Sequence, residues 1–263
     1  MRAFKRNIRG RNIFVQIDDD FFNSQEHLFL SLLSTFHQTE EVSSSSFIVR
    51  PIISDDESYY CNLNDESWVF HLSNRLEDYF AEILDCTILH GSLISVLGKN
   101  ISIIGERMSG KTTLTKHLID KRNAKYLTDD CIYILDEKYF GFCMPIPMRN
   151  AAHRNDNVLC RTYDNENIQR TLFIVSSTVD ELDKMHHIIF PKYDKNVSNI
   201  SVRQVERSHL FNRITTNVRH MSSIREMYRD LNNVIKNISA YEISYSNCDD
   251  VYKWLKVISK NRA

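Results

Sequence analysis

The chain has 263 residues, of which 42% are hydrophobic and 25% are charged, and its formal net charge is -1. This composition is typical of a globular protein long enough to bury a core. The near-zero charge argues against proteins that bind nucleic acid or an anionic membrane surface, because both need a strong positive field. Without a secretory signal, a run of about 18 or more apolar residues, or a CxxC pair, we expect a cytoplasmic protein with no transmembrane helix.

The first part of the chain, residues 1–69, is typical of short strands joined by loops. Residues 12–17 and 46–53 predict strands, and residues 27–36 predict a short buried helix. The pattern changes at residue 70. From there to residue 84 apolar residues recur at helical spacing, which predicts an amphipathic helix with its acidic residues on the exposed side: Glu77, Asp78 and Glu82.

Two hairpins and a helix are predicted in the middle of the chain. Residues 92–97 and 101–104 flank the turn sequence GKN, and a helix is expected to begin near Lys111. Residues 124–127 predict a strand that ends in TDD, and residues 131–143 predict a second hairpin that turns at DEK. The prolines of PIPMRN indicate an extended loop over 145–150.

Strands and helices alternate through the rest of the sequence. Strands are predicted over 171–177, 186–190 and 240–246, and helices over 202–219, 223–237 and 250–260. This alternation favours an α/β fold built on a sheet.

The sequence GERMSGKTT fits the Walker A pattern, which binds the phosphates of a nucleotide such as ATP. Glycine lets the backbone N–H groups converge on phosphate oxygens, and the following helix adds the positive end of its dipole. Lys111 would reach the β- and γ-phosphates, and the Thr112 hydroxyl would bind Mg²⁺. The predicted nucleotide-binding residues are Gly105, Glu106, Arg107, Met108, Ser109, Gly110, Lys111, Thr112 and Thr113.

A phosphate loop that catalyses transfer also needs a carboxylate on a neighbouring strand. Asp129 and Asp130 end the predicted strand that follows the loop's helix. One of the two acids can position Mg²⁺ while the other accepts a proton from an attacking hydroxyl. The alternative, that TDD is only a turn or a helix cap, stays open at this point.

Three further residues are candidates for the functional site, and each can also be explained without a functional role. His90 stands beside Gly91 just before the loop's strand, and it is either an active-site histidine or a structural one. Arg149 and Arg154 can contact a phosphate or a substrate carboxylate, or they are solvated surface residues.

Residues 89–130, which read LHGSLISVLGKNISIIGERMSGKTTLTKHLIDKRNAKYLTDD, resemble the core of the HPr kinase/phosphorylase-like family. The resemblance implies an ATP-dependent kinase whose fold is like that of phosphoenolpyruvate carboxykinase. It also implies a small α+β, β-rich N-terminal subdomain over 1–69 and a kinase domain over 70–263. It assigns Asp130 as proton acceptor for a substrate serine, gives Lys111 and Thr112 to phosphates and Mg²⁺, and puts His90 at the active site. Asp129 is a candidate both for catalysis and for binding the metal, and the sequence leaves open which of the two acids is the base and which is the metal partner.

The chain differs from the full-length enzymes of that family, because it lacks their large N-terminal domain and their glycine-rich segment with a metal-binding glutamate. It looks more like the short members, which include kinases of lasso-peptide precursors. We therefore expect a serine kinase that acts on a peptide or small protein, a ribosomal-peptide precursor being one candidate. Two alternatives remain: a small-molecule hydroxyl kinase on the same scaffold, and a non-catalytic module that senses ATP. The sequence indicates neither the oligomeric state nor the identity of the acceptor.

Overall fold

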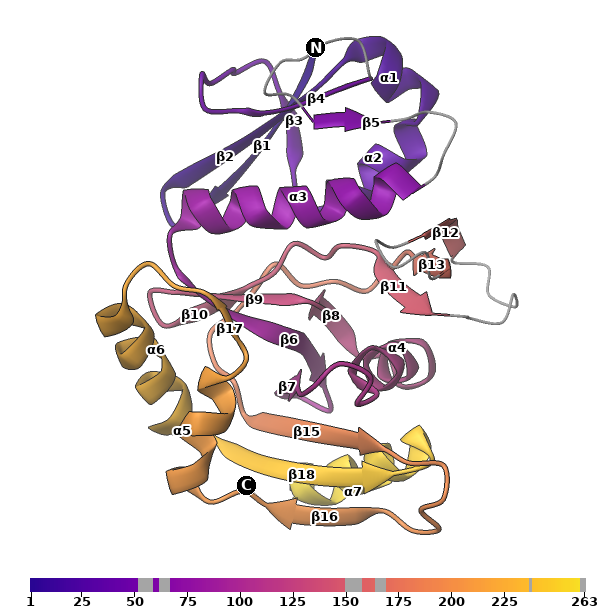
Figure 1. The fold of residues 1–263 in the computed structure, drawn as a ribbon, viewed down its shortest axis with the longest axis vertical. Helices are drawn as coiled ribbons and strands as arrows, with labels where there is room; N and C mark the ends of the chain where they lie inside the picture. The colour runs from indigo at the N-terminus through magenta and orange to yellow at the C-terminus, as the bar shows by residue number, and fades with distance from the viewer. Residues whose placement is uncertain (52–58, 62–66, 150–157, 164–168, 237, 261–263) are drawn as a thin grey trace. The chain divides into compact units, whose positions relative to one another are not determined.

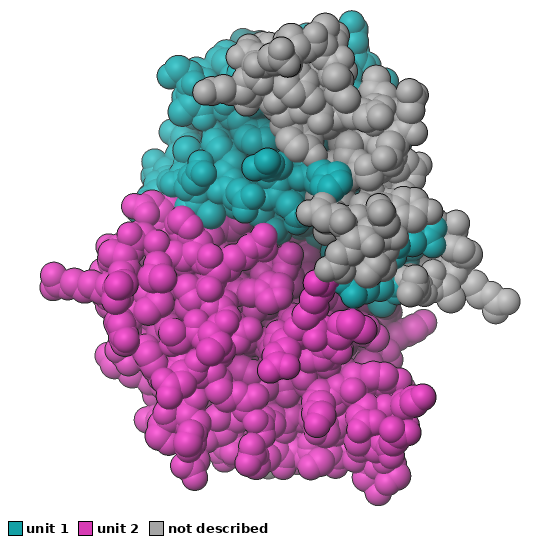
Figure 2. All heavy atoms as spheres, viewed as in Figure 1, with its two compact units in different colours: residues 1–84, 144–174 teal, residues 85–143, 175–263 magenta. Residues whose placement is uncertain are grey.

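A computed structural model describes residues 1–51, 59–61, 67–149, 158–163, 169–236 and 238–260. The chain forms two compact units, which Figure 2 colours separately: unit 1 comprises residues 1–84 and 144–174, and unit 2 comprises residues 85–143 and 175–263. These units are groups of mutual contacts rather than domains of sequence, so the domain boundary expected after residue 69 stays a prediction.

The described residues of unit 1 form two sheets and three helices, which can be followed in Figure 1. The larger sheet has the order β3-β1-β2-β4-β5 and consists of β1 (Arg2–Ile8), β2 (Arg11–Ile17), β3 (His37–Thr39), β4 (Phe47–Pro51) and β5 (Tyr59–Cys61). The smaller sheet has the order β11-β13-β12 and consists of β11 (Ile146–Arg149), β12 (Val158–Tyr163) and β13 (Gln169–Phe173). The helices are α1 (Asp19–Ser24), α2 (Glu26–Leu32) and α3 (Ser67–Leu84).

Most elements predicted for this unit are confirmed, with two corrections. PIPMRN is extended, as expected, but residues 146–149 form strand β11 instead of a loop, because they pair with β13. The helix predicted over 70–84 is α3, and its acidic face is narrower than expected. Glu77 is buried while Asp78 and Glu82 are exposed, because Glu77 lies one helical turn before the buried Ala81 at the edge of the apolar stripe.

Unit 2 is built on one sheet with the order β14-β10-β9-β6-β7-β15-β18-β16, in which β8 and β17 also pair with β6. Its strands are β6 (Thr87–Val96), β7 (Lys99–Ile104), β8 (Lys125–Thr128), β9 (Cys131–Leu135), β10 (Lys138–Phe140), β14 (Glu181–Leu182), β15 (His187–Tyr193), β16 (Ser201–Gln204), β17 (Val218–His220) and β18 (Ser239–Tyr245). Its helices are α4 (Lys111–Arg122), α5 (Arg207–Thr215), α6 (Ile224–Lys236) and α7 (Cys248–Lys260). The expected mixed α/β class is confirmed.

Both predicted hairpins form, and each turns on two residues with positive φ. Leu97 and Gly98 have φ of 55° and 70°, and Asp136 and Glu137 have φ of 50° and 64°. Positive φ at both central residues is the geometry that matches the twist of a two-residue hairpin. The first turn therefore begins one residue earlier than the GKN sequence indicated.

The helix predicted over 202–219 is interrupted at both ends by strands. Residues 201–204 form β16, which pairs with β18, and residues 218–220 form β17, which pairs with β6. Only 207–215 is helical, as α5. Pairing with distant strands overrides the local helical pattern here.

The long strand β6 is the centre of unit 2, because both of its edges are paired along its length. On one edge β9 pairs with residues 87–90 and β8 pairs with residues 93–95, so the β8–β9 junction lies opposite the middle of β6. On the other edge lie β17 and β7. Strands β15 and β18 continue the sheet beyond β7 and run parallel to it.

Helices α5 and α6 cover one face of this sheet, and α4 and α7 cover the other. Leu89 and Leu93 of β6 share a core with Leu210 of α5 and Leu231 of α6. On β18, Ala240 belongs to the same core, whereas its neighbour Tyr241 packs against Trp254 of α7. Alternate residues of a strand point to opposite faces, so α7 lies on the face opposite to α6. His117 of α4 bonds to Asp249 of α7 at 2.7 Å, which places α4 beside α7.

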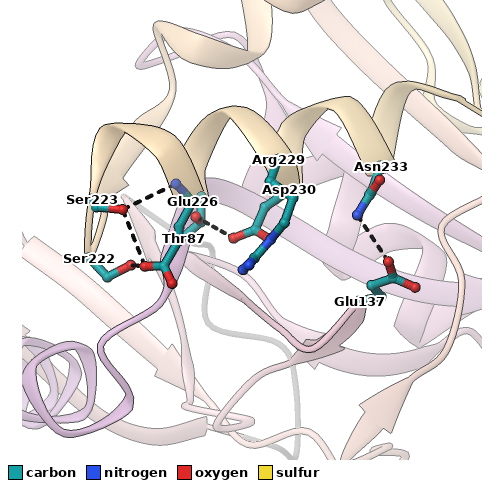
Figure 3. A network of polar contacts seen from close by, with 8 residues as sticks. All are labelled: Thr87, Glu137, Ser222, Ser223, Glu226, Arg229, Asp230 and Asn233. Carbon is teal, nitrogen blue, oxygen red and sulfur yellow. Dashed lines mark hydrogen bonds and ion pairs between the residues drawn. The ribbon is translucent and has the colours of Figure 1, made fainter.

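Helix α6 is fixed at its start and along its buried face (Figure 3). The Glu226 N–H donates to Ser223 Oγ at 3.1 Å, as in one half of a capping box, and the Glu226 carboxylate accepts from the Ser223 hydroxyl. Thr87 Oγ1 of β6 donates to the buried Asp230 at 2.7 Å. Among the described residues, no helix combines the length and apolar character needed to span a bilayer.

Candidate functional site

The loop that joins β7 to α4 requires glycine at position 110. Gly110 has φ of +98°, where a residue with a side chain is strained, and it directly precedes α4. A Cβ added to Gly110 would also lie 2.7 Å from Tyr245 Oη. The preceding turn is closed by a hydrogen bond of 3.2 Å from the Ser109 N–H to the Glu106 carbonyl. The predicted strand, loop and helix are thus present in the expected order.

This loop offers hydrogen-bond donors suited to a phosphate. The N–H groups of residues 111–113 open α4 and have no acceptor within the helix, and Gly110 has no side chain with which to cap them. The hydroxyl oxygen of Ser109 is buried and lacks a hydrogen-bond partner among the described residues. A phosphate at the helix N-terminus would satisfy these donors and meet the positive end of the helix dipole.

Lys111 folds back over the loop. Its ammonium donates to the carbonyls of Gly105 at 2.7 Å and Glu106 at 3.0 Å. Burial lowers the pKa of Lys111, and the negative charges of Asp129 and Asp130 partly counteract the effect. The Lys111 ammonium is therefore held by two backbone carbonyls, which a phosphate could replace as acceptors. It also lies close enough to Asp129 and Asp130 for their charges to affect its pKa.

Asp129 lies at the β8–β9 junction and is only 7% exposed. Ser92 Oγ on β6 donates a hydrogen bond to its carboxylate, and the Thr112 hydroxyl makes a second one. Burial raises the pKa of Asp129 to about 6, the charge of Asp130 adds to the shift, and the two hydrogen bonds and Lys111 oppose it. Asp129 and Thr112 are adjacent oxygen donors of the kind that Mg²⁺ prefers.

Asp130 has a different environment, because its side chain is 38% exposed and each of its oxygens has its own partner. His90 Nδ1 lies 2.8 Å from Oδ1, and Arg219 Nη1 lies 3.5 Å from Oδ2. Burial alone would raise the pKa of Asp130, but the hydrogen bond from His90 and the attraction of His90, Arg219 and Lys111 lower it overall. Asp130 is thus ionised at neutral pH and partly exposed to solvent.

The remaining predicted residues fall into three groups. Glu106, Arg107, Met108 and Thr113 are exposed along the loop and the first turn of α4. Arg149 lies in β11 of unit 1, and Arg154 falls outside the described residues. A contact of either arginine with a phosphate or substrate therefore stays a prediction.

Two residues of the site were missed by the sequence analysis, Ser92 and Arg219. Ser92 lies two residues after His90 on β6, so both point to the same face of the strand. That spacing is a signal that sequence reasoning can use. Arg219 lies on β17 and also donates to Cys131 Sγ, 88 residues away along the chain, at 3.1 Å. No local pattern indicates such a contact.

A metal ion at this site would be held by few protein ligands. Across the part of the chain that the structure describes, no three His, Cys, Asp or Glu residues gather into a metal-binding group. Mg²⁺ needs no such group, since it is commonly held by one or two carboxylates together with phosphate oxygens and water. Thr112 and Asp129 fit that arrangement.

Comparison with known proteins finds similarity only at the level of distant solved structures. No family model and no curated protein matches the chain. Among solved structures, the chain is similar to the Hpr(Ser) kinase/phosphatase from Coxiella burnetii, with a TM-score of 0.33 and 13% sequence identity. The similarity covers 65% of this chain and 92% of that one, and at this TM-score it carries no argument about activity.

Proposed function

We propose that the protein is an ATP-dependent kinase that transfers the γ-phosphate to a serine hydroxyl of a peptide or small protein. One observation carries the proposal. The loop lysine Lys111 lies within electrostatic reach of two adjacent acids whose environments differ, Asp129 being buried against Thr112 and Asp130 being partly exposed and ionised. Pairs of titratable groups whose pKa values are pushed apart are typical of acid–base sites.

The first part of the mechanism is the binding of phosphate. The N–H groups of residues 111–113 and the Ser109 hydroxyl donate to phosphate oxygens, and Lys111 exchanges its two carbonyl acceptors for the β- and γ-phosphates. Thr112 and Asp129 would hold Mg²⁺, which when bound neutralises charge on the phosphates. Catalysis here rests on positioning and electrostatics.

The second part is the transfer itself, in which Asp130 accepts the proton of the acceptor hydroxyl. The hydroxyl oxygen forms a bond to the γ-phosphorus as the bond to the β–γ bridging oxygen breaks, and ADP leaves with that electron pair. The lowered pKa keeps Asp130 ionised, and His90 and Arg219 hold one oxygen each so that the carboxylate keeps its orientation. A weak base suffices, since the transition state is loose and needs little help from proton removal.

The choice of a peptide acceptor is supported by the exposure of Asp130 and by the resemblance of residues 89–130 to short HPr-kinase-related proteins. A carboxylate that reaches solvent is accessible to a serine on a larger chain. A small-molecule alcohol could reach the same carboxylate, so the experiment below includes both classes.

The proposal is tested by incubating the protein with Mg²⁺, γ-labelled ATP and arrays of either serine-ended peptides or small alcohols, and following the acceptor by mass spectrometry. We expect peptides to gain one phosphate with the wild type and with Asp183→Asn, which changes an exposed carboxylate of the same unit. Asp130→Asn should fail to transfer it. If only the alcohols gain phosphate, the acceptor is a small molecule instead of a peptide. ATP binding without transfer to any acceptor would favour a protein that senses ATP.

A further inference from the structure

The geometry of the site indicates where the remaining part of a nucleotide would lie. Lys111, Thr112 and Asp129 mark the side of the loop that faces β6 and the β8–β9 junction. These residues would contact the γ-phosphate end. On its other edge β7 pairs with β15, and the parallel strands β15 and β18 end at the same edge of the sheet as β7. In open α/β sheets, ligands bind outside the carboxyl ends of the strands.

Tyr193, the last residue of β15, lies directly against the loop. Its N–H donates to the Ser109 carbonyl at 3.0 Å. A Cβ added to Gly110 would lie 3.0 Å from the Tyr193 Cβ. The ring packs edge-to-face with Tyr245 at 5.8 Å and 71°, and the Tyr245 hydroxyl in turn donates to the Gly110 carbonyl at 3.3 Å. Tyr193 is thus held by its backbone and by a neighbouring ring.

The two tyrosines differ in exposure, which bears on their roles. Tyr245 is 1% exposed and binds the loop backbone through its hydroxyl, whereas Tyr193 is 51% exposed. The backbone after Tyr193 is also ordered, because the Asp194 N–H donates to the Tyr245 carbonyl at 2.9 Å. A large aromatic side chain that is fixed in position yet left half in solvent, beside a phosphate-binding loop, is a surface on which a nucleobase can stack.

We infer that Tyr193 is the stacking platform for the base of the bound nucleotide. This inference rests on the proposed function, since it needs the triphosphate in the loop with its γ-phosphate toward Lys111 and Asp129. The ribose and base then extend away from the acids, toward the ends of β15 and β18, where Tyr193 is exposed. Stacking of a base on an aromatic ring contributes about 1–3 kcal/mol, which corresponds to about 5- to 150-fold in affinity.

The test compares two ligands that share the phosphates and differ in the base, Mg-ATP and Mg-tripolyphosphate, by calorimetric titration. Tyr193→Ala should weaken ATP binding about 5- to 150-fold and leave tripolyphosphate binding unchanged, and Tyr193→Phe should keep the affinity for ATP. The matched control is Tyr228→Ala, which removes a 48% exposed tyrosine on α6 that stacks on Phe211. It should change neither ligand.

The outcomes separate the inference from the proposed function. Unchanged tripolyphosphate binding also shows that Tyr193→Ala is folded around the loop. Unchanged ATP affinity in that variant, or an equal loss for both ligands, overturns the stacking role and leaves the kinase proposal standing. If the wild type binds neither ligand, the phosphate loop itself is wrong and both proposals fail.

Discussion

The two sides of strand β7 differ in the kind of side chain that they bring to the same loop. On the side of β6, the loop lies near two carboxylates, one bonded to Ser92 and the other to a histidine and an arginine. On the side of β15 it meets two tyrosines that contact its backbone. A single loop thus has titratable groups on one side and aromatic rings on the other, and the proposed function assigns the chemistry to the first side and the holding of the ligand to the second.

A second contrast, within the acid side, shows how position alone divides the roles of identical residues. Asp129 and Asp130 are neighbours in sequence, but they lie in the bend between β8 and β9, where their side chains have different surroundings. Asp129 turns into the sheet, where burial raises its pKa to about 6, and Asp130 turns to solvent between His90 and Arg219, which lower its pKa.

The largest effect is expected from Lys111→Ala. Removing a preorganised positive charge from the phosphates should lower the rate of transfer by at least about 10²- to 10³-fold. Lys121→Ala, which changes an exposed lysine of the same helix, is the control and should transfer at the wild-type rate. Both are measured as labelled phosphate released from ATP or transferred to peptide. A Lys111→Ala variant that is as active as the control would remove the loop from the catalytic site.

Asp129→Asn tests the environment of the buried acid through its effect on the free energy of unfolding. The folded-state pKa of about 6 lies above the ordinary value of 3.8, so the folded state loses stability as the pH rises through that interval. The loss at pH 8 is up to about 3 kcal/mol, at about 1.4 kcal/mol per pH unit. Without nucleotide, Asp129→Asn should therefore be more stable than the wild type at pH 8 and similar to it at pH 4.

This second prediction is measured by urea unfolding of the wild type and Asp129→Asn at both pH values. Asp183→Asn serves as control and should follow the wild type, because its side chain is 81% exposed. If Asp129→Asn is no more stable than the wild type at pH 8, ionisation of the buried Asp129 carboxylate does not destabilise the folded state.

A smaller effect, on stability, is expected from a substitution at Gly110, where the loop contacts Tyr245. Gly110→Ala places a side chain at φ of +98° and 2.7 Å from Tyr245 Oη, so it should destabilise the protein by about 1–3 kcal/mol. Gly98→Ala has a positive φ of 70° but open space around it, and should cost only about 1–2 kcal/mol. Thermal unfolding ranks the two variants. Equal losses would mean that the contact with Tyr245 adds nothing to the strain.

How much of this site the sequence reveals depends on how far apart its residues lie. Residues 105–113 and the hairpins are local patterns, in which glycine, turn residues and alternation act within about ten positions. Arg219 reaches Asp130 because β17 pairs with β6, and Tyr193 reaches the loop because β15 pairs with β7, and such pairings have no local signal. Pairing of β16 with β18 and of β17 with β6 likewise made strand of residues 202–204 and 218–219, where helix was predicted.

The most direct test of the account measures affinity and transfer together in Asp130→Asn and Tyr193→Ala. Mg-ATP affinity is determined by titration, and the transfer rate to a serine peptide is measured at saturating ATP. We expect the two variants to lose different properties. Asp130→Asn should keep its affinity for Mg-ATP and lose about 10²- to 10⁴-fold in transfer rate, while Tyr193→Ala should lose affinity for Mg-ATP and keep its transfer rate. Transfer at the wild-type rate in Asp130→Asn would contradict the role assigned to that carboxylate.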